Sequence, residues 1–433
     1  MDYFEITSPV AKFDSLRTIL AVANQFNLEI HGMDVNGAYL NAKLEEEIYM
    51  YQPPGFDDGS GRVLRLNLNL YGLKQGGRCW NEKFTKELLN LGYHQSAADK
   101  CIFIRISNNH INILVVYVDD LGIIADTEQE IAKMKAELTD LFQMTDLGPL
   151  TKILGLKIDC NCENGTLKLS QGPYIDLILD CFGMTECHPA TTPMAQNVKL
   201  QLPEEPELHD KYPIAIGSLM YAALGTHPDI AFAMHHLSQF TTNHTKVHYT
   251  ALKCVFRYLK GTKNVGIIFK RNLKGLNFQM FIDADFANLD DGKSISGYSS
   301  NIGGGCATWS SKKQPIVALS TTEAEYIAIT HGAKQVVWLR QLLSDLGMDI
   351  SSPFPMLCDN LAAITISKDN SYHAKTKHIN IRYHYIRERL ASREATLNHV
   401  VSKDNAADTF TKVPDPNQHR KLMSLLGMGE LLR

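Results

Sequence analysis

Two adjacent aspartates, Asp119 and Asp120, stand between two apolar runs in the segment Asn112 to Ala125, NILVVYVDDLGIIA. Such runs on either side of a short polar step predict a β-hairpin with both carboxylates at its tip. Adjacent like charges repel each other unless a cation is present. Magnesium prefers oxygen ligands, so the pair suits a divalent metal site. A simple polar turn also commonly uses Asp, and the hairpin alone leaves both interpretations open.

A third carboxylate would complete such a site. Two divalent ions about 4 Å apart can clamp the attacking and the leaving oxygens of a phosphoryl transfer, which takes two or three carboxylates. Asp34 closes an earlier extended stretch that begins near Leu28. It is therefore the candidate for the third ligand.

Hydrophobic periodicity predicts the elements around these residues. Leu16, Ile19, Leu20 and Ala23 follow the spacing of an amphipathic helix. Further helices are predicted over 78–91, ended by Gly92, and over 129–142, and a hairpin over 154–169.

The composition changes after a proline-rich linker near 189–206, and two further regions follow. The segment 212–258 is mostly helical, with a break at 225–228. Beyond Leu276 the predicted order is β-β-β-α-β-α-β-α, with strands over 277–286, 294–302, 306–311, 356–358 and 397–401 and a long helix over 321–346.

Composition limits the class of protein. At 433 residues the chain should form two or three domains, and 44% hydrophobic with 21% charged residues is ordinary for a globular protein. The net charge is −4, but residues 246–274 hold eight Lys or Arg and no acid, and residues 372–393 are also basic. Such runs are typical of solvated helix faces and also of phosphate contacts. No signal peptide or membrane-length apolar run is present, so we expect a protein of the cytoplasm or the nucleus.

Three motifs, in order along the chain, resemble the reverse transcriptase of copia-type LTR retrotransposons. They are Met33-Asp34-Val35 with Ala38-Tyr39-Leu40-Asn41, Leu70-Tyr71-Gly72-Leu73-Lys74-Gln75 with Arg78 and Trp80, and Tyr117-Val118-Asp119-Asp120. Each is short, but all three at family spacing are specific. The resemblance implies that Asp34, Asp119 and Asp120 are catalytic metal ligands.

The same resemblance implies contacts to substrate. Tyr39 would be the steric gate against a ribose 2′-hydroxyl, and Gln75 would lie under the incoming base pair. Lys74 and Arg78 would contact the phosphates of the incoming nucleotide.

The region after Leu276 resembles the ribonuclease H domain of the same elements. The matching motifs are Phe281-Ile282-Asp283-Ala284-Asp285, Ser320-Thr321-Thr322-Glu323-Ala324-Glu325-Tyr326, Cys358-Asp359-Asn360, Lys375-Thr376-Lys377-His378-Ile379 and Ala406-Ala407-Asp408. The implied metal ligands are Asp283 on the first strand, Glu325 on the long helix, Asp359 at the end of the fourth strand and Asp408 on the last helix. Lys377 and His378 would contact the hybrid.

Two glutamates, Glu323 and Glu325, are candidates for the metal ligand on the long predicted helix. Ser320 and Glu323 have the spacing of a capping box, in which Glu323 reaches back to the amide of the cap residue. This gives Glu323 a structural role and favours Glu325 as the ligand.

The family pattern is incomplete in three places. The loop Val401 to Asp404 lacks the mobile histidine of cellular ribonucleases H, for which His378 could substitute, although a helix-face histidine is more often structural. Gly76-Gly77 stand where the family usually has Ala-Pro, and His227 stands where it has Arg.

The resemblance covers nearly the whole chain and implies an α+β fold: a right-hand polymerase palm with partial fingers over 1–155, a thumb or connection region over 156–275, a ribonuclease H domain over 276–412 and a tail over 413–433. Two Mg²⁺ or Mn²⁺ ions per active site, an RNA template, a DNA primer, the RNA–DNA hybrid and deoxynucleoside triphosphates are the implied cofactors and partners. Family members continue upstream of Phe4 with a basic strand pair, so weak polymerisation by this chain alone is a further expectation. The alternative is a truncated relic that retains only ribonuclease H activity or only nucleic-acid binding.

Overall fold

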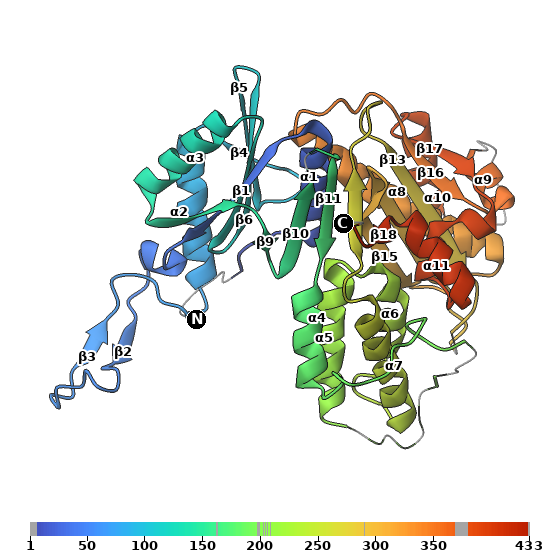
Figure 1. Ribbon diagram of the computed structural model, residues 1–433, viewed down its shortest axis with the longest axis horizontal. Coiled ribbons are helices and arrows are strands. Elements are labelled where there is room, and N and C mark those ends of the chain that lie inside the picture. Colours follow the sequence, from blue (N-terminus) through green and yellow to red (C-terminus); the bar gives the residue numbers. More distant parts are fainter. Residues whose placement is uncertain are drawn as a thin grey trace. The chain divides into compact units, whose positions relative to one another are not determined.

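The chain divides into two compact units (Figure 1). The computed structural model describes residues 7–161, 163–196, 200–201, 203, 205, 207, 209–289, 291–368 and 380–431. The first unit comprises Met1–Leu16, Leu28–Leu154 and Asp345–Gly347, and the second comprises Arg17–Asn27, Gly155–Ser344 and Met348–Arg433. Among the described helices, none combines the length and apolar character of a membrane span.

A six-stranded sheet is the centre of the first unit. Its strand order is β4-β5-β6-β7-β1-β8, from β1 (Glu29–Val35), β4 (His94–Gln95), β5 (Ile102–Ser107), β6 (His110–Tyr117), β7 (Asp120–Ala125) and β8 (Met144–Pro149). Helices α2 (Gly76–Asn90) and α3 (Glu128–Leu141) share one hydrophobic core with it, in which Trp80, Phe84 and Phe103 are buried. The buried face of the sheet therefore lies under these helices (Figure 1).

Three smaller elements complete the first unit. They are the 3₁₀ helix η1 (Ala38–Asn41), the hairpin of β2 (Tyr49–Tyr51) and β3 (Val63–Arg65), and the short strand β9 (Lys152–Ile153). The hairpin extends away from the six-stranded sheet in Figure 1. Tyr51 near its start is 85% exposed, so this hairpin adds little to the core.

A helical core fills part of the second unit. Helices α4 (Gly172–Cys181), α5 (Lys211–Gly225), α6 (Ala231–Ser238) and α7 (Lys246–Thr262) pack together, with the 3₁₀ helix η2 (Pro228–Ile230) between α5 and α6. An antiparallel series of strands adjoins them in the order β18-β12-β11-β10, from β10 (Leu156–Asn161), β11 (Thr166–Ser170), β12 (Gly266–Lys270) and β18 (Met428–Gly429).

A mixed five-stranded sheet forms the rest of the second unit. Its order is β15-β14-β13-β16-β17, from β13 (Phe278–Asp285), β14 (Ile295–Ile302), β15 (Gly305–Lys313), β16 (Phe354–Cys358) and β17 (Ala395–His399). β13, β14 and β15 are antiparallel, whereas β13, β16 and β17 run parallel. The other elements are α8 (Thr321–Asp345), α9 (Leu361–Lys368), α10 (Asn380–Ala391), α11 (Pro416–Leu425), η4 (Ser402–Asp404) and η5 (Ala406–Phe410).

Helix α8 packs closely on the central strand of this sheet. A Cβ at Gly332 would lie 2.8 Å from Ile282 Cδ1 and 3.1 Å from Met280 Sδ, so a larger residue at position 332 would require these side chains of β13 to shift. This close packing brings the first turns of α8 beside the carboxyl end of β13.

Helix α1 (Phe13–Phe26) is anchored to the second unit through Arg17. This arginine is 1% exposed and donates to the carbonyls of Ala307, Leu224 and Gly225 at 2.6, 2.5 and 2.9 Å. Its guanidinium also lies 3.7 Å from the ring centroid of Trp309, at cation–π distance. The buried charge is thus fully engaged by backbone carbonyls and an aromatic face.

Most predicted elements agree with the structure, and among the described residues the fold combines helices with one six-stranded, two five-stranded and one two-stranded sheet. One prediction is wrong: Asp408 lies in the 3₁₀ helix η5 and not on the last helix, since α11 begins only at Pro416. Asn405 initiates η5 by accepting from the amide of Ala407, and Pro414 and Pro416 prevent a continuous helix from forming. The division at 155, 275 and 412 into smaller domains remains a prediction.

Candidate active sites

The first predicted carboxylate cluster assembles from two neighbouring strands. Asp34 on β1 is the register partner of Asp120 on β7, and residues opposite each other on antiparallel strands present their side chains to the same face. Tyr117 pairs with Asp120 across the β6–β7 hairpin, which leaves Val118 and Asp119 as its two-residue turn. The sequence therefore places Asp34 and Asp120 side by side, with Asp119 next to them in the turn.

The turn that carries Asp119 is held in an unusual conformation. Val118 has φ +58°, in the left-handed region that β-branched residues rarely adopt. Trp80 Nε1 donates to the Val118 carbonyl at 2.7 Å, and the Val35 amide donates to the Asp119 carbonyl at 2.9 Å. These bonds from α2 and β1 fix the position of the aspartates against the sheet.

Burial and the neighbouring carboxylates affect the pKa of Asp120 in this cluster. Partial burial, followed by the charges of Asp119 and Asp34, raises the pKa of Asp120. All three carboxylates are half-buried, and their oxygens are not among the described groups whose ligand atoms lie within 4.8 Å of one another. Carboxylate oxygens are nevertheless the ligands that a divalent cation such as Mg²⁺ prefers.

Tyr39 lies close to this cluster. It is half-buried in η1 and stacks on Tyr71, with ring centroids 4.6 Å apart and planes inclined at 23°. Burial first, and then the charges of Tyr71, Asp119 and Tyr117, raise its pKa. The phenol is therefore within electrostatic range of the aspartates, as a residue that contacts the substrate sugar would have to be.

The Gly76-Gly77 pair, where the family usually has Ala-Pro, lies against Ser8, Asn69 and Tyr39. A Cβ at residue 77 would lie 2.8 Å from Ser8 Oγ, and one at residue 76 would lie 3.2 Å from Asn69 Oδ1. The corresponding distances to Tyr39 are 3.5 and 3.4 Å, which are ordinary van der Waals contacts, so the departure from Ala-Pro leaves the position of Tyr39 unexplained.

The other residues predicted to contact the nucleotide lie at the start of α2. Gln75 is 2% exposed and donates to Glu46 Oε2 at 3.4 Å. Arg78 forms ion pairs with Glu46 at 3.3 Å and Glu82 at 3.2 Å, and Lys74 is exposed. A bound triphosphate would therefore have to compete with two glutamates for Arg78.

The second predicted cluster assembles entirely within the second unit. Oxygen atoms of Asp283, Asp359 and Asp408 lie within 4.8 Å of one another, and the same holds for ligand atoms of Glu325, Cys358 and Asp359. Asp359 belongs to both groups and connects them. All four predicted ligands are thus brought together from segments that are far apart in the sequence.

Strand register explains two of these four positions. Ile282 on β13 pairs with Cys358 on the parallel strand β16, so the residues that follow, Asp283 and Asp359, emerge at the same edge of the sheet. Asp408 is held beside them because Asn405 Nδ2 donates to the Ile282 carbonyl at 2.9 Å. Glu325 comes from the second turn of α8 and is 6% exposed.

Burial of so many carboxylates strongly disfavours their ionised forms. Burial, then the charges of Asp283 and Asp359, raises the pKa of Glu325 to about 9. Burial, then the charge of Asp283, raises the pKa of Asp408 to about 7, and burial also raises the pKa of Asp283. Asp285, the last residue of β13, is half-buried, and burial raises its pKa as well.

Several residues at this second cluster were missed by the sequence analysis. Thr411 donates its hydroxyl to Asp283, Ser402 donates to Asp359 Oδ2 at 2.5 Å, and Cys358 Sγ lies 3.8 Å from Glu325 Oε2. Lys412 Nζ lies 2.9 Å from Asp408 Oδ1. The sequence indicates the roles of Thr411 and Lys412 only through their spacing, since both residues follow Asp408 by about one helical turn.

The donor set of the second cluster fits a pair of divalent ions. It offers carboxylate oxygens, the ligands that Mg²⁺ and Mn²⁺ prefer. Asp408 Oδ1 is buried and its cationic partner is Lys412, whose Nζ lies 2.9 Å away, so an ion bound at this oxygen would take the place of the ammonium. Asp283, Glu325, Asp359 and Asp408 would hold the ions.

The two glutamates of α8 have different surroundings. The amide of Glu323 donates to Ser320 Oγ at 3.2 Å, while its carboxylate accepts from the amide of Leu319 at 2.8 Å. The predicted capping arrangement is therefore present with one correction, because the carboxylate reaches the residue before Ser320. The backbone turns at 319–320 so that the Leu319 amide points toward the helix.

We expect Glu323→Ala to lower the free energy of unfolding by roughly 1 kcal/mol, because the amide of Leu319, just before the helix, loses its acceptor. Urea denaturation of the metal-free protein would measure it. Glu325→Gln is the matched control, since it leaves the cap intact and removes one of the mutually repelling carboxylates. Loss of stability in the control and not in Glu323→Ala would reverse the two assignments.

Three further residues were singled out in the sequence: Lys377, His378 and His227. Lys377 and His378 lie outside the described residues. His227, where the family has Arg, is fully buried, and its Nδ1 lies 3.1 Å from Asp229 Oδ1, while Tyr258 donates to Asp229 Oδ2 at 2.5 Å. His227 is thus part of a buried polar network in the helical core.

Comparisons with known proteins agree with both the motifs and the geometry. Residues 1–196 match the family described as "Reverse transcriptase (RNA-dependent DNA polymerase)". The chain is 41% identical to the retrovirus-related Pol polyprotein from transposon TNT 1-94 of Nicotiana tabacum and 37% identical to that from transposon RE1 of Arabidopsis thaliana, over 99% of this chain in both alignments.

The lengths of these relatives differ widely. The chain covers 33% of the tobacco polyprotein and 29% of the Arabidopsis one, so it spans about a third of each. A protein of Saccharomyces cerevisiae named for transposon Ty5-1 is 31% identical over 70% of this chain and is covered completely. The chain belongs to the family of copia-type retrotransposon Pol polyproteins and corresponds to their reverse transcriptase region.

Proposed function

We propose that this chain is an RNA-directed DNA polymerase with ribonuclease H activity, which copies retrotransposon RNA into DNA and degrades the RNA of the resulting hybrid. Two observations support this proposal: the strand pairing of Asp34 with Asp120 in the first unit and the four-carboxylate cluster in the second, both at the positions where the family motifs fall.

In the first unit, the six-stranded sheet with α2 and α3 would be the palm. Asp34, Asp119 and Asp120 would hold two Mg²⁺ or Mn²⁺ ions, which activate the attacking oxygen and stabilise the leaving group when bound. The described residues supply the rest: Tyr39 faces the sugar, Gln75 supports the base pair, and Lys74 and Arg78 contact the triphosphate. An RNA template, a DNA primer and deoxynucleoside triphosphates are the proposed substrates.

In the second unit, the mixed sheet with α8 would be the ribonuclease H domain. Asp283, Glu325, Asp359 and Asp408 would hold a second pair of ions. Thr411 and Ser402 orient Asp283 and Asp359 through their hydroxyls. The hybrid would be recognised by the shape of its backbone and its 2′-hydroxyls. Basic residues on α7 are a candidate contact, because Lys246, Lys253 and Arg257 all lie on its exposed face.

The test uses the purified 433-residue chain in two assays, primer extension on an RNA template and cleavage of RNA in an RNA–DNA hybrid. Both activities should require Mg²⁺ or Mn²⁺ and disappear when EDTA removes the ion. Cleavage without synthesis would favour the alternative of a chain with ribonuclease H activity alone. Absence of both activities from folded protein would refute the proposal.

A further inference from the structure

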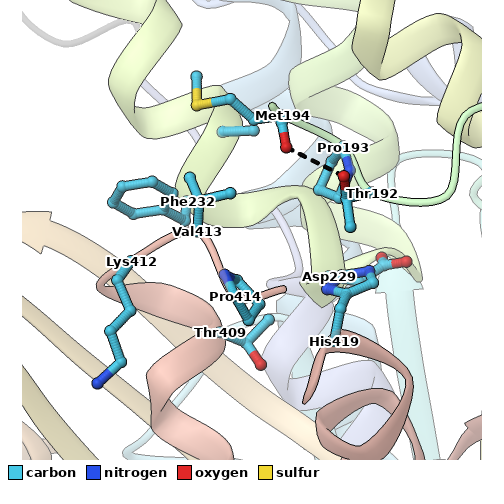
Figure 2. A pocket seen from close by; sticks show the side chains of 11 residues that line it. Thr192, Pro193, Met194, Asp229, Phe232, Thr409, Lys412, Val413, Pro414 and His419 are labelled. Carbon is cyan, nitrogen blue, oxygen red and sulfur yellow. Dashed lines mark hydrogen bonds between the residues drawn. The ribbon is translucent and has the colours of Figure 1, made fainter. Parts of the chain in front are cut away.

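Lys412 lies between the second carboxylate cluster and a small pocket. The pocket is lined by Lys412 together with Thr409, Val413, Pro414, Asp229 and His419. Figure 2 shows the lysine side chain extending away from Asp229 and His419. Its Nζ instead lies 2.9 Å from Asp408 Oδ1 and 4.0 Å from Asp283 Oδ2. The ammonium thus contacts two of the four carboxylates that would bind metal.

The local backbone directs this lysine back to the cluster. Lys412 follows Asp408 by four residues, and its amide donates to the Asp408 carbonyl at 3.3 Å. Residues with this spacing on a helical turn have neighbouring side chains. Thr411, the preceding residue, donates to Asp283. Two consecutive residues after η5 therefore support the same pair of carboxylates.

Lys412 is the cation that partners this cluster. Across the described residues, no other Lys or Arg forms an ion pair with Asp283, Glu325, Asp359 or Asp408. Its side chain is 44% exposed, whereas those of Asp283 and Asp408 are 5% and 8% exposed. The lysine can therefore turn toward solvent without opening the core, while the two aspartates cannot.

We propose that Lys412 is a built-in counter-ion, which neutralises Asp283 and Asp408 in the metal-free protein and competes with divalent ions for these carboxylates. This inference rests on the proposed ribonuclease H site. The ammonium and a divalent ion repel each other, and both require Asp408, so the lysine has to leave when the ion binds. Lys412 is thus a positioning residue that sets the affinity of the site for metal.

The test compares Lys412→Met with Lys421→Met in the 433-residue protein. Lys421 is a suitable control, because it is 40% exposed and forms an ion pair with Asp404 at 2.5 Å outside the four-carboxylate cluster. Every protein also carries Asp119→Asn and Asp120→Asn, which silence the first cluster. Free Mn²⁺ is measured by its electron paramagnetic resonance signal during titration.

We expect Lys412→Met to bind Mn²⁺ about tenfold more tightly than the protein with Lys412, and Lys421→Met to be unchanged. Without metal, Lys412→Met should melt at a lower temperature, and Mn²⁺ should raise that temperature by more than in the parent. Lys412→Arg keeps the charge and should retain the weaker Mn²⁺ affinity of the parent, which keeps the test informative if Lys412→Met folds poorly.

Two results would overturn the inference: equal or weaker Mn²⁺ affinity in folded Lys412→Met, or tight binding in Lys412→Arg. Failure of the proposed ribonuclease H site itself gives a different result. In that case a further Asp359→Asn substitution would leave the Mn²⁺ binding of the parent unchanged.

Discussion

Replacing Asp119 and Asp120 together by Asn should abolish DNA synthesis and leave cleavage of RNA in the hybrid within about twofold of the parent protein. Amides cannot supply the anionic charge that the metal pair requires. The ions contribute several kcal/mol of transition-state stabilisation, and each 1.4 kcal/mol is a factor of ten, so a loss of at least about a thousandfold is expected. Primer extension on an RNA template measures it.

The double substitution should not unfold the protein. Burial and neighbouring charges already raise the pKa of Asp120, so replacement of its carboxylate by a neutral amide relieves repulsion in the first unit. Asp140→Asn, the same replacement at an exposed position on α3, is the control and should retain synthesis. Loss of both activities in a folded double variant would contradict two independent sites, because substitutions in separate cores should act independently.

Asp359→Asn should have the opposite effect, with RNA cleavage reduced by at least about a thousandfold and DNA synthesis retained. Asp359 is the most informative of the four carboxylates because it belongs to both groups of candidate ligands. It is also only partly buried, with Ser402 as its hydrogen-bond donor, so an amide can be accommodated.

Cleavage of a labelled RNA–DNA hybrid would measure this effect. The control is Asp349→Asn, an exposed aspartate of the same unit whose carboxylate accepts from the amide of Ser351, which should cleave normally. If Asp359→Asn retained cleavage with intact folding, the second cluster would not be the nuclease site.

Local patterns predicted the elements that carry both clusters. The apolar runs around Asp119-Asp120 specify the β6–β7 hairpin, and the long periodic segment after Ser320 specifies α8. In each of them the signal lies within one short window of sequence, where strand alternation and helix periodicity act.

Features that depend on partners far along the chain could not be predicted. The pairing of Asp34 with both β7 and β8, the burial of Arg17 under Trp309, and the contact of Lys412 with Asp283 all join residues separated by at least 85 positions. The error at Asp408 has a different cause, because a 3₁₀ turn stabilised by Asn405 has no hydrophobic periodicity. The positions of the four acidic residues came from family motifs and not from periodicity.

The position of β1 between β7 and β8 affects the order in which the two clusters can form while the chain is being synthesised. Asp34 is synthesised before both strands that fix its register, which end at Ala125 and Pro149. Similarly, Asp283 is synthesised before the two residues that complete its cluster. Asp359 directly follows β16, and Asp408 lies in η5. Vectorial synthesis should therefore complete the first cluster well before the second. A nascent chain paused between Pro149 and Asp408 would already contain the three strands that carry the first cluster, whereas the second cluster would still lack Asp408.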